Sequence, residues 1–389
     1  MRSLILLVLA FFVQQPLSYA ELRPDVAAAL GDFASQVQSP GASLTIIEGE
    51  EIVVDKAIGV ADLEQQVPMS TDKLNRIGSI SKTVTAAAAI RMARNGQIDF
   101  DGRVSDYLEG FDGPARDDTL RQLASHTGCV RGYRDGEGIS YIHYNDVFAA
   151  LALFRDDALE CLPGAQFIYS SYGYTLLSAV MTRAAGKSLE AVMHDEVWGP
   201  LGLDHFDFDD LREVIPGRVR NYEMGAGGEL INAPYSDSSY KYAGAGMIAS
   251  TQDLARFGAA LIDGKFLTAG EQGKMFAPAT LNDGSAIDYG LGLYVDFTKF
   301  IEARREYIPA QLYDSLITQA SGRKIYWHSG TSEGAVAILM FEPEEERVLA
   351  LALNRGGVEK EAIVFAMGVM TMLREQDEVF QTGGISEAK

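Results

Sequence analysis

The sequence contains few cysteines, few histidines and few positive charges. Its 389 residues include two cysteines and five histidines, and no His/Cys group has the spacing of metal ligands, so no metal is predicted. The glycine-rich stretch at residues 225–228 lacks the strand, turn and helix of a phosphate-binding loop, so no cofactor is predicted either. Lys and Arg number 33 against 54 Asp and Glu, a net charge of −21. Such a protein repels a phosphate backbone, which excludes nucleic acid as a partner.

The sequence also lacks an apolar run long enough to span a bilayer. Residues 4–13 are apolar but short, they follow a positively charged start at Arg2, and residues 18–20 form a small-x-small cleavage site. This pattern is typical of a secretory signal peptide. We therefore expect residues 1–20 to be removed, the mature chain to begin near Glu21, and the protein to be exported, periplasmic or secreted, without a stable membrane anchor. An uncleaved anchor is the alternative.

The two cysteines are Cys129 and Cys161. An exported protein that keeps two cysteines can pair them, so a disulfide between them is one expectation. Two buried, reduced thiols are the other.

The remaining composition, 47% hydrophobic and 10% aromatic, is that of a globular protein. Strand patterns occur near both ends of the chain, at residues 42–47, 52–58, 289–295, 324–328, 336–341 and 348–353, while residues 101–220 are mostly helical in pattern. These patterns predict an α/β (α+β) fold in which helices flank an antiparallel sheet built from both chain ends, with a mostly helical inserted subdomain. We expect one domain at residues 21–380, made of α/β parts at about 21–100 and 225–380 and an insert at about 101–224, then a frayed tail at 381–389.

Ser79 and Lys82 are the first candidate catalytic residues, because they begin an Ala-rich helix expected at residues 79–95. Residues three apart on a helix share a face, so the Lys82 amine can reach the Ser79 hydroxyl. The helix N-terminus also favours an anion that forms at that serine. By itself, S-x-x-K is weak evidence, because a capping serine followed by a solvated lysine is the commoner origin of this pattern.

Two further motifs support the catalytic interpretation. Tyr169, in Tyr-Ser-Ser before a helix, could relay a proton if the ammonium of Lys82 lowered its pKa; a core aromatic is the alternative. In the stretch at residues 327–331, an edge strand could bind a substrate amide, and the backbone N–H of Thr331 could join that of Ser79 in an oxyanion hole. His328 would lie beside Tyr169 and Lys82 as a hydrogen-bonding or cationic partner, unless it is a surface histidine at a strand end.

These motifs resemble those of the serine β-lactamase and penicillin-binding protein superfamily, in particular its class C-like branch. The family motifs S-x-x-K, Y-x-N and K-T-G correspond here to Ser79-Ile80-Ser81-Lys82, Tyr169-Ser170-Ser171 and His328-Ser329-Gly330. The likeness covers about residues 26–357 and includes residues 120–128, 240–246, 250–257 and 289–292. Within the branch, the chain looks most like the mitochondrial β-lactamase-like serine hydrolases and their bacterial relatives, which are usually regarded as peptidases or esterases.

The resemblance implies a serine hydrolase that forms an acyl-enzyme on an amide, peptide or ester. Ser79 would be the nucleophile, Lys82 and Tyr169 would transfer its proton, and Ser171, His328, Ser329 and Gly330 would bind the substrate. Two residues depart from the pattern. Ser171 replaces an asparagine and loses a hydrogen-bond donor, and His328 replaces a lysine, which makes the affinity for a carboxylate weaker and pH-dependent.

Two other functions remain open on the sequence. One is a true class C-like β-lactamase or D,D-carboxypeptidase, which would use the same groups. The other is a non-catalytic ligand-binding or scaffold protein on the same fold. The physiological substrate and the oligomeric state are not encoded in any pattern that we recognise.

Overall fold

The computed structural model describes residues 24–303, 305–308 and 310–383. The expected signal peptide at residues 1–20 lies outside these ranges. Of the tail expected at residues 381–389, the first three residues belong to the last helix and the others lie outside the described residues. No helix in the described ranges is both long enough and apolar enough to cross a membrane.

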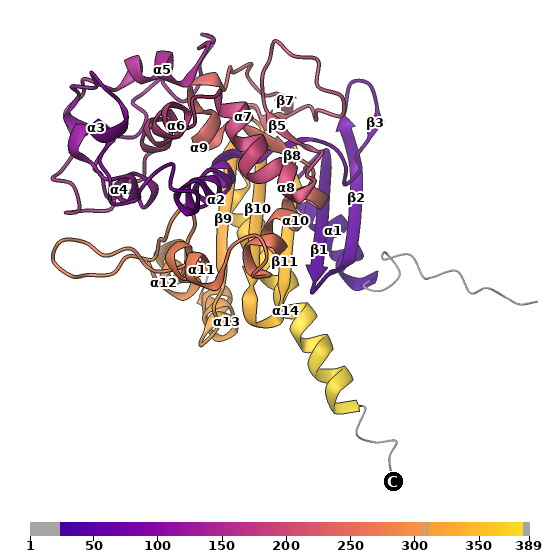
Figure 1. Ribbon diagram of the computed structural model, residues 1–389. Helices are drawn as coiled ribbons and strands as arrows, with labels where there is room; N and C mark the ends of the chain where they lie inside the picture. The colour runs from indigo at the N-terminus through magenta and orange to yellow at the C-terminus, as the bar shows by residue number, and fades with distance from the viewer. Residues whose placement is uncertain (1–23, 304, 309, 384–389) are drawn as a thin grey trace, which may run out of the picture.

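A six-stranded antiparallel sheet forms the centre of the molecule, with the strand order β3-β2-β1-β11-β10-β9 (Figure 1). Its strands are β1 (Gly41–Glu48), β2 (Glu51–Asp62), β3 (Val67–Pro68), β9 (Tyr326–Ser332), β10 (Ala335–Glu342) and β11 (Arg347–Leu353). The first strand pairs with the last, in a register that runs from Ala42 opposite Leu353 to Glu48 opposite Arg347. The prediction of a sheet built from both chain ends is therefore confirmed, and so is the α/β fold.

Both faces of the sheet are buried at its central strands β1, β10 and β11, because helices cover each face there. Along β10, the side chains of Ala337, Leu339 and Phe341 enter one core and the alternating ones enter the other, as the two-residue period of a strand requires. The helices α1 (Pro24–Gln36) and α14 (Glu359–Gly383) pack on one face. On the other face, α2 (Ser81–Arg94) and α10 (Thr251–Ile262) lie between the sheet and the rest of the helices (Figure 1).

The helix α2 is the buried axis of the second layer. The four alanines 86–89 are completely buried, and their small side chains let α6 (Ser171–Ala185), α9 (Tyr242–Ala245) and α11 (Ala269–Met275) contact this helix. The α-helix begins at Ser81 and not at Ser79, since Gly78–Ile80 form a 3₁₀ turn that leads into it. Ser79 thus lies on this turn, at the buried entrance of α2.

The helices between α2 and α9 are short, apart from α6. The short ones are α3 (Val104–Tyr107), α4 (Leu120–Ala124), α5 (Val147–Ala150), α7 (Leu189–Met193) and α8 (Gly199–Leu201). A capping box begins α4, because the Thr119 hydroxyl accepts from the Gln122 N–H at 3.2 Å and the Gln122 amide oxygen accepts from the Thr119 N–H at 2.9 Å. Two small sheets complete the fold: β4 (Asn75–Arg76) and β5 (Phe206–Phe208) flank β8 (Met247–Ala249), and β6 (Tyr222–Met224) pairs with β7 (Leu230–Asn232).

Two strand predictions were wrong in their extent. Residues 289–295 form no strand but fold back on themselves: the Gly290 N–H donates to the Leu293 carbonyl at 2.9 Å, and Gly292 has a left-handed φ of 83°. The strand predicted at residues 324–328 is β9, which begins at Tyr326 and continues to Ser332, and so includes the edge-strand stretch expected at residues 327–331. His328 therefore lies inside a strand and is 2% exposed, so it is not a surface histidine at a strand end.

Candidate active site

Lys82 connects three segments of the chain at one point. Its Nζ lies 3.2 Å from the Ser79 hydroxyl and 3.0 Å from the Ser171 hydroxyl, and it donates to the Gly244 carbonyl at 2.7 Å. Ser79 comes from the turn before α2, Ser171 from the first residue of α6, and Gly244 from α9. The structure thus brings together Ser79, Lys82 and Ser171, the residue that stands where the resembled family has an asparagine.

Two glycines let the edge strand β9 approach the turn that carries Ser79. A Cβ atom on Gly330 would lie 1.8 Å from the Ile77 carbonyl oxygen, and one on Gly78 would lie 2.6 Å from the Thr331 backbone nitrogen. Gly78 also has a φ of 48°, which glycine adopts at little cost. The backbone of Thr331 is therefore held against the Ser79 turn, where the sequence predicts the oxyanion hole.

The Lys82 side chain is completely buried. Its three hydrogen-bond partners are two hydroxyls and a carbonyl, which carry no charge. Burial, and secondly the positive charge of Lys241, hold the pKa of Lys82 well below its usual range. The direction agrees with the one required of a base, because a lower pKa increases the share of neutral amine, which can accept a proton.

Tyr169 binds Ser79 but its pKa shifts in the direction opposite to the prediction. The phenol is hydrogen-bonded to Ser79, which lowers its pKa, but burial is the larger effect and raises the pKa of Tyr169 well above 10. The Nζ of Lys82 lies over the face of the tyrosine ring, 4.6 Å from its centre. The expectation that the ammonium lowers this pKa was therefore wrong, and Tyr169 remains a phenol that can donate and accept a proton.

His328 is buried as a neutral ring. Its Nδ1–H donates to the Ser329 carbonyl at 2.5 Å, and its Nε2 accepts from the Tyr289 hydroxyl at 3.1 Å. Burial, and secondly the charge of Lys82, lower the pKa of His328 to about 3. The prediction of a histidine whose charge changes with pH near neutrality was wrong, because the ring lies in the core and near Lys82. The hydroxyl that His328 hydrogen-bonds is thus that of Tyr289. The ring of Tyr169 lies nearby, with 6.3 Å between the two ring centres.

The other residues predicted to bind substrate have different surroundings. The Ser329 hydroxyl donates to the carboxylate of Glu359, at the start of α14, and so points to a group outside the Lys82 cluster. Gly330 packs against Ile77. Ser171 hydrogen-bonds both Lys82 and the Tyr133 side chain, so its hydroxyl joins Lys82 to the loop at residues 131–140.

Several residues at the site were not assigned a role from the sequence. Gly244 accepts from Lys82, and Lys241 forms a buried ion pair with Glu333, with 2.9 Å between Nζ and Oε1. Lys241 also donates to the Gly138 carbonyl at 3.2 Å. The family likeness at residues 240–246 could have identified Lys241 and Gly244 as candidate site residues. The pairing of Lys241 with Glu333 could not be predicted, because no local spacing relates these two residues.

A disulfide joins Cys129 to Cys161 beside the site. The two segments that it links are also hydrogen-bonded through their backbones: the Gly164 N–H donates to the Thr127 carbonyl at 2.7 Å and the Ile168 N–H to the His126 carbonyl at 2.8 Å. Tyr169 follows directly, so this pair of segments leads the chain to the candidate site.

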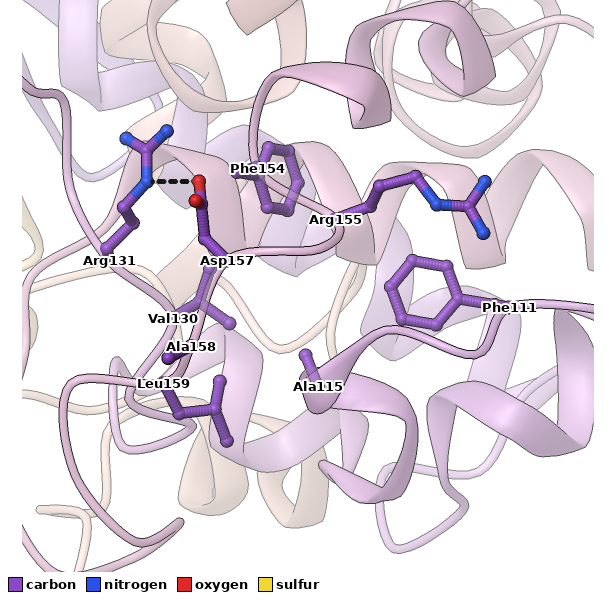
Figure 2. A pocket seen from close by; sticks show the side chains of 9 residues that line it. All are labelled: Phe111, Ala115, Val130, Arg131, Phe154, Arg155, Asp157, Ala158 and Leu159. Carbon is purple, nitrogen blue, oxygen red and sulfur yellow. Dashed lines mark hydrogen bonds and ion pairs between the residues drawn. The ribbon is translucent and has the colours of Figure 1, made fainter.

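A small pocket lies next to these segments (Figure 2). Phe111, Val130, Arg131, Phe154 and Asp157 are among its lining residues, and Arg131 Nε donates to Asp157 at 2.7 Å. None of the Lys82 cluster lines it. It belongs to the scaffold of the site, because the Arg131 carbonyl accepts from the hydroxyl of Ser170, the residue after Tyr169, at 2.6 Å.

A sequence model of the family described as "Beta-lactamase" matches residues 26–366. The chain belongs to this family. It is 27% identical over 303 residues to the human "Serine beta-lactamase-like protein LACTB, mitochondrial", with 59% of this chain and 54% of that protein covered. It is 25% identical over 279 residues to a D-aminopeptidase of Cereibacter sphaeroides, with 68% of this chain and 51% of that protein covered. The chain thus spans about half the length of these curated relatives.

Solved structures of this fold are also similar. The octameric penicillin-binding protein homologue from Pyrococcus abyssi has a TM-score of 0.74 at 20% identity and covers 90% of this chain and 77% of its own. The D-amino acid amidase from Ochrobactrum anthropi SV3, in complex with L-phenylalanine amide, has a TM-score of 0.74 at 19% identity, with 92% and 99% covered. At these identities the likeness establishes the fold.

Proposed function

We propose that the protein is a serine hydrolase that forms an acyl-enzyme on Ser79 with an amide, peptide or ester substrate. The observation that carries the proposal is the meeting of Ser79, Lys82 and Tyr169, with a lysine whose pKa is lowered by burial and a phenol hydrogen-bonded to the serine. A nucleophile with a base in reach and a second proton carrier is the arrangement of covalent acyl transfer. The membership in the beta-lactamase family supports the same reaction class.

In the acylation step, Ser79 Oγ bonds to the carbonyl carbon while its proton passes to the neutral amine of Lys82. The carbonyl electron pair moves to the oxygen, where the backbone N–H groups of Ser79 and Thr331 would stabilise it by about 3–4 kcal/mol per donor. Collapse of this intermediate breaks the bond to the leaving group. The leaving atom takes a proton from the Tyr169 hydroxyl, and Tyr169 recovers one from Lys82.

Deacylation repeats these steps with water as the nucleophile. Water gives a proton to Lys82 as its oxygen bonds to the acyl carbon, and the bond to Ser79 Oγ then breaks. The products are a carboxylic acid and free Ser79, which regains its proton. Each group thus returns to its initial state, and no oxidant or reductant is required.

The neutral His328 favours substrates that are not recognised through a negative charge. A permanently charged lysine at this position would attract a carboxylate, whereas a neutral ring bonded to Tyr289 provides no such attraction. We therefore propose amides or esters with an uncharged group at this end of the site. The amidase and aminopeptidase among the similar proteins act on amide bonds according to their names, which agrees with this class.

The test is a hydrolysis panel with the wild type, Ser79→Ala and Ser43→Ala. Ser43 is a matched control, because its buried hydroxyl has no hydrogen-bond partner among the described residues and lies on β1. We expect turnover of p-nitrophenyl butyrate or a D-amino acid amide, little turnover of nitrocefin, and loss of activity in Ser79→Ala alone. Activity that persists in Ser79→Ala would refute the proposal, and efficient nitrocefin turnover would make the protein a β-lactamase.

We also propose that residues 1–20 direct export and that residues of about 101–224 form an inserted helical subdomain. The charged start, the short apolar run and the small-x-small site support the first of these. N-terminal sequencing of the exported protein should give Glu21 as the first residue. An unprocessed Met1 would contradict it.

A further inference from the structure

His126 contacts Tyr169 and both of its neighbours in the chain. Its carbonyl accepts the N–H of Ile168 at 2.8 Å, and its Nδ1 accepts the N–H of Ser170 at 3.2 Å. These are the two neighbours of Tyr169 in the chain. Its ring also packs on the tyrosine ring, with 4.3 Å between the centres and a tilt of 42°. A single residue therefore fixes the backbone on both sides of Tyr169 and the ring itself.

The conformation of His126 is unfavourable by itself. Its φ of 60° is left-handed, which is uncommon for a residue other than glycine. The residue is 2% exposed, and its Nε2 has no hydrogen-bond partner among the described residues. A buried polar atom without a partner destabilises a fold. Glycine would suit the backbone and phenylalanine would fill the space, but neither would provide an acceptor to Ser170.

The contacts also determine the protonation state of His126. Because Nδ1 accepts an amide N–H, it holds the lone pair, and the proton of the neutral ring is on Nε2. Burial, and secondly the charge of Lys82, hold the pKa of His126 well below its usual range. Its ring contacts the rings of Phe167, Tyr174 and Tyr289. Phe167 has no ionisable group, and burial raises the pKa of both tyrosine hydroxyls, so these rings carry no charge near neutral pH. The acceptor at Nδ1 is thus maintained at physiological pH.

We propose that His126 is a positioning residue for Tyr169: it holds the phenol at the Ser79 hydroxyl and so controls proton transfer without touching the substrate. The inference rests on the proposed acyl transfer, because the transferred proton is the one that Ser79 gives up. An imidazole is required for both parts of this role, since the ring supports Tyr169 and the nitrogen holds Ser170.

A double-mutant comparison separates positioning from ordinary stabilisation. His126→Asn tolerates the left-handed backbone and keeps an acceptor oxygen but loses the ring, whereas His126→Phe keeps a ring and loses the acceptor. Each is made in the wild type and in Tyr169→Phe, and kcat, KM and the melting temperature are measured with p-nitrophenyl butyrate. In the wild type we expect kcat to fall about 10- to 100-fold with KM nearly unchanged. In Tyr169→Phe, which is itself slower by about 10²–10⁴, the same changes should have almost no further effect on kcat. Equal losses in both backgrounds would overturn the proposal.

A readout that does not depend on activity keeps the two proposals distinguishable. With 3-fluorotyrosine at position 169, we expect more or broader ¹⁹F resonances in both His126 variants than in the wild type, whereas the same label at Tyr242 should be unaffected. An unchanged spectrum at position 169 would contradict the positioning role. If Ser79 is not acylated in the wild type, the proposed function fails, and the spectrum still decides whether His126 orders Tyr169.

Discussion

The two halves of the candidate site are held in place by different forces. Ser79 and Lys82 lie at the entrance of α2, whose alanines are enclosed between the sheet and other helices, so the hydrophobic core positions them. Tyr169 lies in a segment without regular secondary structure. That segment is held by the disulfide, by two hydrogen bonds to His126, and by the hydrogen bond of the Ser170 hydroxyl to the Arg131 carbonyl. The half that contains Ser79 and Lys82, the nucleophile side, therefore depends on packing. The half that contains Tyr169, the relay side, depends on individual polar and covalent contacts.

Lys82 offers the largest change on the nucleophile side. We expect both Lys82→Met and Lys82→Arg to lower kcat/KM by about 10²–10⁴, because proton transfer by a positioned base contributes that much. Arginine carries a positive charge but does not release its proton, so this variant distinguishes a base from a cation at position 82. Steady-state hydrolysis checks this prediction. Substantial activity in Lys82→Arg would mean that only the positive charge is needed.

Removal of the disulfide should act on the relay side. The loop that it closes has a sequence separation of 32, so Cys129→Ala with Cys161→Ala should lower the free energy of unfolding by about 3–4 kcal/mol. Denaturant unfolding measures this loss. Hydrogen exchange in the native state should increase in residues 160–170 and stay unchanged in residues 81–94. Equal increases in both segments would show that the two halves are not held independently.

Gly330→Ala tests the contact between the sheet edge and the Ser79 turn. The new Cβ would collide with the Ile77 carbonyl, so we expect a loss of about 3 kcal/mol in unfolding free energy, at the upper end for overpacking. Gly368→Ala is the matched control, because nothing lies within 4 Å of its added atom in α14, and it should be neutral or stabilising by about 0.5–1 kcal/mol. A Gly330 variant as stable as the control would show that β9 can move away from the turn.

His328 should give the smallest change, since its charge is not expected to vary in the working range of pH. The pKa of His328 is about 3 in the folded protein. Its NMR C2–H resonance should therefore stay constant from about pH 8 to 5, a range in which an ordinary histidine, with a pKa of about 6.5, titrates. Because the folded pKa is the lower one, His328 stabilises the fold above pH 6.5. This contribution is lost as the pH falls toward 3. A titration centred near pH 6.5 would restore a cationic role for His328.

The sequence predicts well what depends on local periodicity. The spacing of Ser79 and Lys82 places them within contact, and the strand patterns near both chain ends predict one sheet to which both ends contribute, as β1 and β11 do. It does not predict what depends on burial or on distant partners. The pKa directions of Tyr169 and His328 come from desolvation, and the contact of Lys241 with Glu333 spans 92 residues. Neither burial nor such a contact leaves a local pattern.

Labelling of the intact protein with a fluorophosphonate is the most direct test of the acyl-enzyme. Mass spectrometry of the wild type should show a single adduct, mapped by proteolysis to Ser79, and none in Ser79→Ala, while the melting temperature of the two proteins stays nearly equal. An adduct that remains in a folded Ser79→Ala protein, or maps to another residue of the wild type, would contradict the account.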